Sequence, residues 1–445
     1  MNKLIDGYLS FLDNGKTERR CATEIIKQAE EAGYKSIDSF KSLKAGDRVY
    51  ICKMGKAVML FDIGSEDISN GMNILGAHID SPRLDVKQNP VYEKSGIVYL
   101  NTHYYGGIKK YQWLAMPLAI NGFVFLKNGK KIDINVGDDP EDPVFCISDI
   151  LPHIAQKQME KIASEFIEGE NLDLIIGVGP KAKDGETDPN KNRIISIFKE
   201  KYGFDEADFG SAELEVVPAG KSRLSGFDKS MVLGYGQDDR VCSYTSLRAM
   251  LDVRAQKRTT CCLLVDKEEI GSLGATGMSS QLLPNAVAEV LAKLDTAKDD
   301  KVPFELRLRR TLSNSFMLSS DVNSAYDPLN WRLYDKQNSS YLSRGVVFNK
   351  YTGSRGKSGA SDANPEFIAK IRARLEEKGI SYQMAELAKV DIGGGGTIAK
   401  YAAEYGMQVV DCGVPVQSMH APWELTSVYD IDQVYQCYRE FITIE

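Results

Sequence analysis

The stretch MVLGYGQDDRVCSYTSLRAMLDVRAQKRTTCCLLVDKEE, residues 231–269, decides the fold. Its first apolar run ends in two aspartates, a helical pattern follows through 243–256, and a second apolar run, 260–265, ends in two glutamates. Short apolar strands separated by helices are typical of a mostly parallel sheet that helices cover on both faces. Ligands of such sheets bind beyond the carboxyl ends of the strands. The stretch therefore predicts an α/β fold with a polar site where the strands end.

The same alternation of short apolar strands and helices is found toward both ends of the chain, but not in its middle. MNILGAHIDSP (72–82) and NSFMLSSD (314–321) each read as a short strand that runs into polar residues. Strand-like segments dominate the middle, interrupted by a helical pattern at 150–167. We predict a discontinuous α/β domain, 1–85 and 226–445, that carries an inserted β-rich domain, 86–225.

Composition excludes several classes of protein. The 445 residues are 43% hydrophobic and 26% charged, with a net charge of −7, and no apolar run reaches the ~20 residues of a membrane span. No basic stretch is interleaved with aromatic residues, which argues against a nucleic-acid partner. No secretory signal is visible at the start, and the eight cysteines form no CxxC pair, so they read as reduced thiols. These features predict a soluble cytoplasmic protein.

Polar clusters follow strand-like runs at several places, and their side chains suit a metal site. His78 and Asp80 are two apart, so in an extended chain both point to the same side. That arrangement suits a metal-bound imidazole whose other nitrogen is held by a carboxylate; the alternative is a solvated strand end that opens a turn. The clusters are His78 with Asp80, Asp238 with Asp239, Glu268 with Glu269, Asp321, and His420.

The carboxylates allow both catalytic and structural interpretations. Of Glu268 and Glu269, one can bind a metal while the other takes a proton from water, or both can belong to a solvated turn. One of Asp238 and Asp239 can bridge two cations, and which one does so stays open. Asp321 alone could instead cap a helix.

Charge arithmetic favours two metal ions over one. Two imidazoles and three carboxylates around two divalent cations leave one positive charge, which a hydroxide would neutralise. A single zinc ion does not need so many carboxylates, and magnesium does not favour histidine. Nitrogen and oxygen donors without thiolate suit zinc, with cobalt or manganese as substitutes. The set therefore predicts a two-metal hydrolase.

The motifs GAHIDSP, YGQDDRVCSYTSL, DKEEIGSLGATG, SSDVNSAYDP and SMHAPWE, in this order, resemble the M18 family of metallo-aminopeptidases, the aspartyl aminopeptidase and aminopeptidase I group. The resemblance runs from near the N-terminus to the end of the chain. It implies a di-zinc aminopeptidase with an α/β catalytic domain and an inserted domain that mediates assembly. It also implies a homo-oligomer, since members of this family form tetrahedral dodecamers.

The resemblance also assigns roles to individual residues. Asp238 would bridge the two zinc ions, with His78, Glu269, Asp321 and His420 as the other ligands. Glu268 would be the general base, and Asp80 would orient His78. His153, in Leu-Pro-His (151–153), would reach a neighbouring subunit's active site or associate with zinc there. The specificity position for an acidic substrate side chain falls on Asn349 or Lys350.

The sequence therefore predicts a cytoplasmic, di-zinc aminopeptidase that removes the N-terminal residue from peptides, with a preference for Asp or Glu if Lys350 occupies the specificity position. Two alternatives stay open. A related two-metal core can serve a deacylase or a carboxypeptidase. A non-catalytic assembly protein would use only the oligomerising domain.

Overall fold

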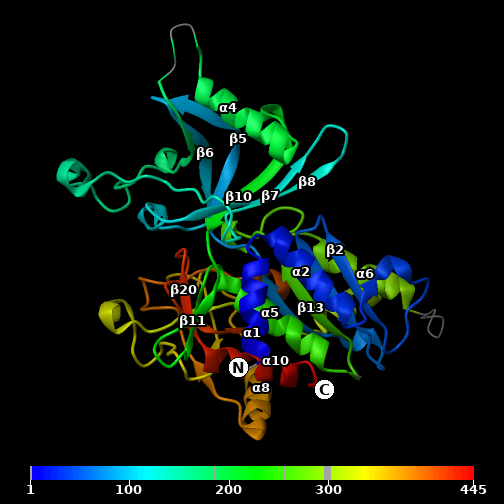
Figure 1. Ribbon diagram of the computed structural model, residues 1–445. Coiled ribbons are helices and arrows are strands. Elements are labelled where there is room, and N and C mark those ends of the chain that lie inside the picture. Colours follow the sequence, from blue (N-terminus) through cyan, green and yellow to red (C-terminus); the bar gives the residue numbers. More distant parts are fainter. Residues whose placement is uncertain (1–2, 182, 184–185, 255, 295–301) are drawn as a thin grey trace. The chain divides into compact units, whose positions relative to one another are not determined.

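The computed structural model describes residues 3–181, 183, 186–254, 256–294 and 302–445, and it divides into two compact units (Figure 1). The first unit comprises the chain up to Asp80, Ser222–Met419 and Glu424–Glu445. The second comprises Ser81–Lys221 and His420–Trp423. Within the described residues, none of the helices has the length and apolar character needed to cross a membrane.

The main sheet of the first unit is mixed. Its centre, β13-β4-β14-β18, is parallel throughout. The pairs β2–β3, β3–β13 and β18–β16 are antiparallel, whereas β1–β2 and β16–β17 are parallel. The strands, in sheet order, are β1 (Lys35–Ser36), β2 (Arg48–Lys53), β3 (Ala57–Asp62), β13 (Thr260–Val265), β4 (Asn73–His78), β14 (Phe316–Ser320), β18 (Gln408–Gly413), β16 (Val346–Asn349) and β17 (Tyr382–Met384).

Helices cover both faces of this sheet, because its buried strands are apolar on both sides (Figure 1). Along β4, Leu75 and Ala77 belong to one apolar core and Ile74 to the other, as the two-residue period of a strand requires. The first core includes residues of α1 (Lys3–Asn14), α2 (Glu18–Glu31), α5 (Gln237–Asp252), α8 (Pro365–Lys378) and α10 (Val428–Phe441). The second includes residues of α6 (Leu282–Lys293), α7 (Phe304–Ser313) and α9 (Ala399–Ala403).

A smaller sheet in the first unit has the order β11-β12-β20-β19-β15. The apolar run at 231–235 lies here as β12, which pairs antiparallel with its neighbours and is not part of the main sheet. Its partners, β11 and β20, come from the segments that flank it in this smaller sheet, so its place depends on distant residues and not on its own pattern. The strands are β11 (Arg223–Ser225), β12 (Met231–Gly234), β20 (Glu424–Ser427), β19 (Pro415–Gln417) and β15 (Asn323–Ser324).

The second unit is built on an antiparallel sheet of order β8-β7-β10-β5-β6-β9, against which α4 (Pro189–Ile197) packs. The predicted helix at 150–167 is wrong: only η4 (Pro152–Ile154) and α3 (Gln156–Met159) form there. Residues 150–154 and 157 are exposed, so no apolar face packs to stabilise a longer helix. The strands are β8 (Lys131–Val136), β7 (Leu118–Phe125), β10 (Ala212–Pro218), β5 (Arg83–Lys94), β6 (Ile97–Tyr105) and β9 (Leu174–Val178).

Candidate active site

His78 ends β4, in the parallel centre of the main sheet. Its backbone is fixed on both sides: the N–H donates to Asp239 Oδ2 (3.4 Å), and the carbonyl accepts from Ser243 Oγ (2.7 Å). The ring is 2% exposed. Its Nδ1 lies 3.0 Å from the Asp80 carbonyl oxygen and 3.3 Å from Asp80 Oδ1. The other ring nitrogen, Nε2, is therefore the one available to the site.

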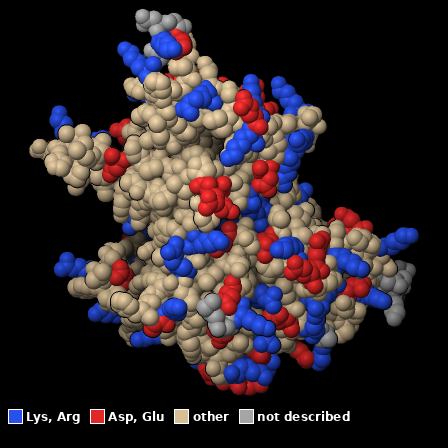
Figure 2. Space-filling view, in the orientation of Figure 1, with Lys and Arg blue, Asp and Glu red and all other residues tan. Residues whose placement is uncertain are grey.

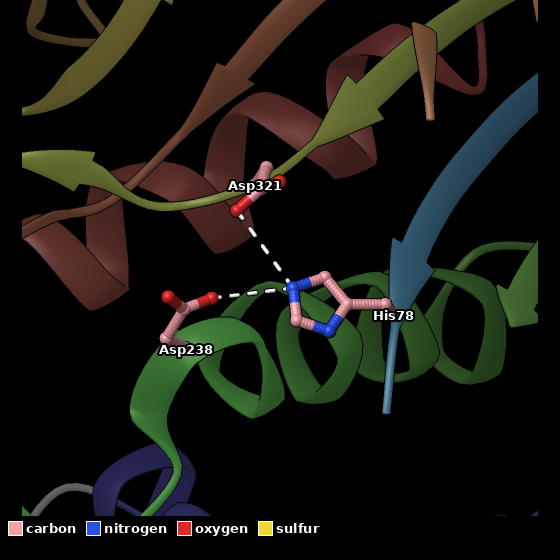
Figure 3. Close-up of side chains that lie close together, drawn as sticks. All are labelled: His78, Asp238 and Asp321. Carbon is pink, nitrogen blue, oxygen red and sulfur yellow. Dashed lines mark ion pairs between the residues drawn. The ribbon is translucent and has the colours of Figure 1, made fainter. Parts of the chain in front are cut away.

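Asp238 and Asp321 meet at this nitrogen (Figure 3). His78 Nε2 lies 3.2 Å from Asp238 Oδ1 and 3.9 Å from Asp321 Oδ1. Asp238 lies at the start of α5, where its own backbone and that of Asp239 are non-helical. Asp321 follows the last residue of β14, and its N–H donates to Cys412 O (3.0 Å). Three segments that are distant in sequence thus bring their polar ends to one point.

Glu268 and Glu269 follow β13 on a short turn, η8 (Glu268–Ile270). Lys267 has a left-handed backbone (φ +70°), which turns the chain immediately after the strand. Asp80 then holds the turn, because its Oδ1 accepts from Glu268 N–H (3.2 Å) and its Oδ2 from Glu269 N–H (3.3 Å). An oxygen of Glu269 lies within 4.8 Å of an oxygen of Asp238.

The cluster contains more carboxylate than cationic charge, and this excess governs its electrostatics. Burial alone would lower the pKa of His78, but its hydrogen bonds with Asp238 and Asp80 hold the pKa well above the usual value. Burial raises the pKa of Asp239 and of Asp321, and the Asp239 charge raises that of Asp321 further. Buried like charges oppose ionisation, so the cluster favours a bound cation that offsets them.

The donor atoms fit zinc. Two ligand atoms on one tetrahedral zinc ion, each at ~2.0–2.1 Å, are separated by about 3.3 Å. The two distances from His78 Nε2 bracket that value. One imidazole and two carboxylates are donors that zinc accepts, and Asp80 supplies the partner that a metal-bound histidine ordinarily has on its other nitrogen.

The remaining predicted residues lie on other segments of the chain. His420 belongs to the second unit, where its Nδ1 lies 2.9 Å from Gly107 O. His153 is exposed in η4. Asn349 is buried in β16; it accepts from Asn323 (3.1 Å) and donates to Ala385 O (2.9 Å), and Lys350 beside it is exposed.

Sequence reasoning left the role of Asp239 open and missed Glu424, and both residues position the site. Asp239 accepts from the backbone of His78, and Glu424 Oε2 accepts from the Asp238 N–H (3.1 Å). Glu424 is 1% exposed. Its signal in the sequence is weak, since a glutamate two residues after proline reads as a loop residue until the pairing of β20 is known.

Comparison with known proteins bears on this arrangement. The family model described as aminopeptidase I zinc metalloprotease (M18) matches residues 11–442. A probable M18 family aminopeptidase 1 of Clostridium acetobutylicum is 54% identical over 442 residues, covering 98% of this chain and 94% of that protein.

Solved structures agree. The crystal structure of an M18 aminopeptidase from Thermotoga maritima has a TM-score of 0.94 at 42% identity, covering 99% of this chain and 96% of that one. That of aminopeptidase I from Clostridium acetobutylicum has a TM-score of 0.91 at 53% identity, covering 99% and 95%. The S. cerevisiae mApe1 dodecamer shares the fold alone, with a TM-score of 0.78 at 20% identity, covering 99% and 96%. This chain belongs to the aminopeptidase I zinc metalloprotease (M18) family of hydrolases.

Proposed function

We propose that the protein is a di-zinc aminopeptidase whose ions lie among the residues around His78. The observation that carries this proposal is the convergence of His78, Asp238 and Asp321, which offer one nitrogen and two oxygens within 4.8 Å of one another. These three would hold one ion. Asp238 also approaches Glu269, so its two oxygens can serve two ions. Asp238 and Glu269 would hold the second ion together with His420, which the motif SMHAPWE assigns to it. Cobalt or manganese suits the same donors.

The chain itself supports His420 as the second imidazole. His420 lies between β19 and β20, which pair antiparallel at Gln417 and Leu425. Glu424, at the start of β20, accepts from the Asp238 N–H. The short connection from Gln417 to Glu424 limits how far His420 can lie from the residues that Glu424 contacts.

The proposed chemistry assigns the proton transfers to Glu268. When bound, zinc ions polarise the scissile carbonyl and lower the pKa of the attacking water. Glu268 accepts a proton from that water and delivers it to the leaving amine. Asp80 contacts both the backbone of Glu268 and the ring of His78, so it fixes the position of the general base relative to a metal ligand. Asp80 is therefore a positioning residue.

We propose a homo-oligomer in which the segment 150–162 of the second unit contacts a neighbouring copy. Leu151, Ile154, Met159 and Ile162 are 52%, 69%, 68% and 63% exposed, an unusual density of apolar side chains for a free surface. The dodecamer of the yeast relative makes the same assembly the first candidate. His153, in the middle of this segment, would then reach the neighbour's substrate.

For substrate choice, Lys350 is the better candidate to meet an acidic side chain. The amide of Asn349 already bonds at both of its ends, whereas the Lys350 side chain is exposed. A panel of aminoacyl substrates with Asp, Glu, Leu, Lys and Met measures the preference. Lys350→Met should lower the rate for Asp and Glu while leaving that for Leu within about twofold.

We propose that the protein binds peptides as its substrates and that it acts in the cytoplasm. On the face in Figure 2, basic and acidic side chains are interspersed, with no continuous basic surface of the kind that binds nucleic acid. All eight cysteines are free thiols, most of them buried. Both observations suit a cytoplasmic enzyme that acts on peptides.

Two matched peptides test the proposed activity. Leu-Ala-Ala should be hydrolysed from its N-terminus and acetyl-Leu-Ala-Ala should not, in protein that contains two zinc ions per chain by elemental analysis. Chelation should abolish hydrolysis and added zinc should restore it. Cleavage of the acetylated peptide would favour a deacylase, release of the C-terminal residue a carboxypeptidase, and no hydrolysis with fewer than two ions an assembly protein.

A further inference from the structure

An open groove of about 690 Å³ lies on the first unit. It runs along the chain at 380–384 and is walled by residues of 336–344 and by Tyr429. None of the groove-lining residues belongs to the set around His78, Asp238 and Glu268. The proposed hydrolysis therefore makes no use of this groove.

The floor of the groove is the edge strand β17, which pairs only with β16 in the described part of the chain. The Ser381 carbonyl and the Ala385 N–H both bond to β16, at 3.0 Å each. Backbone groups alternate in direction along a strand. Those of Tyr382 and Met384 therefore point away from β16, along the open edge. Such an edge accepts an extended segment as an additional strand.

The wall opposite this edge is fixed in place. Gln383 accepts from the Tyr341 N–H (2.9 Å) and donates to the Tyr341 carbonyl (2.8 Å). Asp430 accepts from the backbone N–H groups of Ser343 (2.6 Å) and Gly345 (2.7 Å). A groove held by these contacts needs little rearrangement to receive a ligand, which lowers the entropic cost of binding.

The charges of the groove select the kind of segment. Lys336 and Arg344 are exposed on its wall, and the Arg344 guanidinium lies 4.2 Å from the centre of the Tyr341 ring. Within the described residues, neither cation has a carboxylate partner, and no Asp or Glu lines the groove. Side chains of an added strand alternate, so carboxylates at every second position would meet this wall.

We propose that this groove docks an extended peptide segment with acidic residues at alternate positions, which adds to β17 as a further strand. The backbone of the segment bonds to Tyr382 and Met384, and its carboxylates pair with Lys336 and Arg344. The protein would thereby hold a partner protein's acidic segment at a place separate from the catalytic one.

A blocked peptide tests the proposal, because it is no substrate for an aminopeptidase. Rhodamine-labelled acetyl-Val-Glu-Val-Glu-Val-Glu-amide should bind the full-length protein, as followed by fluorescence anisotropy. Lys336→Glu with Arg344→Glu should weaken binding by about tenfold or more, while hydrolysis of Leu-Ala-Ala stays unchanged. Lys41→Glu with Lys44→Glu, two exposed lysines elsewhere on the same unit, is the matched control and should leave both measurements unchanged.

Two further probes separate strand addition from simple charge attraction. In the first probe, N-methyl groups replace the backbone N–H hydrogens of every second residue, on the edge of the peptide that would face β17. The dissociation constant should rise by about tenfold or more, because this peptide cannot pair with β17. A peptide with lysine in place of glutamate should not bind. The proposal would be overturned if the N-methylated peptide bound as tightly as the unmethylated one. It would also be overturned if the Lys336→Glu/Arg344→Glu variant bound the peptide as tightly as the Lys41→Glu/Lys44→Glu control. A third outcome would also overturn it: the unaltered protein does not bind the peptide, and the Lys336→Glu/Arg344→Glu variant differs from it in oligomer size. The occupant of the groove would then be a second copy of this chain.

Discussion

Two buried charged groups in the first unit differ in their balance of charge. Arg48 and Asp62 form a matched ion pair with Nε–Oδ1 at 2.6 Å, and the remaining guanidinium donors bond to Tyr34 and to backbone carbonyls. Around His78, in contrast, carboxylates exceed the cationic groups. The comparison teaches that burial of charge alone does not mark a functional site. An unbalanced buried charge does, since it needs a ligand of opposite sign.

The largest expected effect concerns catalysis by the unbalanced group. Glu268→Gln removes the proposed base but keeps a side chain of equal size, so kcat should fall by roughly two to four orders of magnitude. Zinc content and the melting temperature should stay within error. Glu289→Gln, on the exposed side of α6, is the control and should keep full activity. If the Glu268 variant were as active as the control, Glu268 would have no place in the mechanism.

A change to the Arg48–Asp62 ion pair should lower the stability of the protein and leave its zinc binding unchanged. Asp62→Asn leaves Arg48 buried without its counter-ion, and the free energy of unfolding should drop by about 3–5 kcal/mol. Urea unfolding, with and without chelator, measures the drop, which should be equal in the two conditions. A drop seen only in the zinc-bound protein would mean that this pair, too, belongs to the site.

A site carboxylate should behave in the opposite sense. Asp321→Asn relieves repulsion among buried carboxylates, so the chelated variant should be more stable than the chelated parent protein by about 1 kcal/mol. The same change should lower the zinc content and the activity. Destabilisation of the chelated variant would show that the excess of negative charge is not a cost to this fold.

The last prediction concerns the pH dependence of stability at Asp430, a buried carboxylate whose partners are backbone N–H groups. Burial raises its pKa to about 7, even though hydrogen bonds from Gly345 and Ser343 lower it. Its folded pKa lies above the unfolded value, so its stabilising contribution is complete below about pH 4 and is lost as the pH rises through 7. Between pH 5 and 7 the parent protein should lose at most about 1.4 kcal/mol per pH unit relative to Asp430→Asn. Urea titrations at both pH values measure this, and parallel curves would refute it.

Much of the fold could be predicted from local pattern. The apolar runs that became β4, β13 and β14 are followed by the polar residues that the site uses, because strand ends and polar turns are both local properties. Helices on both faces follow from strands that are apolar throughout. The short run at 231–235 forms β12 of the smaller sheet and not a strand of the predicted parallel sheet, since pairing partners depend on distant segments. The prediction of a helix at 150–167 is wrong because a helical period of apolar residues does not stabilise a long helix unless one face packs against other residues.

The site was less predictable than the sheet. Pattern alone could suggest His78 beside Asp80, since two residues of one strand share a side. It could not show that Asp80 also bonds to the backbone of Glu268 and Glu269, because that contact joins the ends of two neighbouring strands. The role of Glu424 was invisible for the same reason.

The order of strands in the main sheet has a consequence during synthesis on the ribosome. β4 is complete at residue 78, but its neighbours β13 and β14 begin only at residues 260 and 316. At 5–20 residues per second, the strand that carries His78 waits roughly 10 to 40 seconds for its first neighbour. Throughout that time β4 lacks the strands that flank it in the sheet, while most of the intervening polypeptide, Ser81–Lys221, is translated. We expect the nascent chain to depend on chaperones most strongly in this interval.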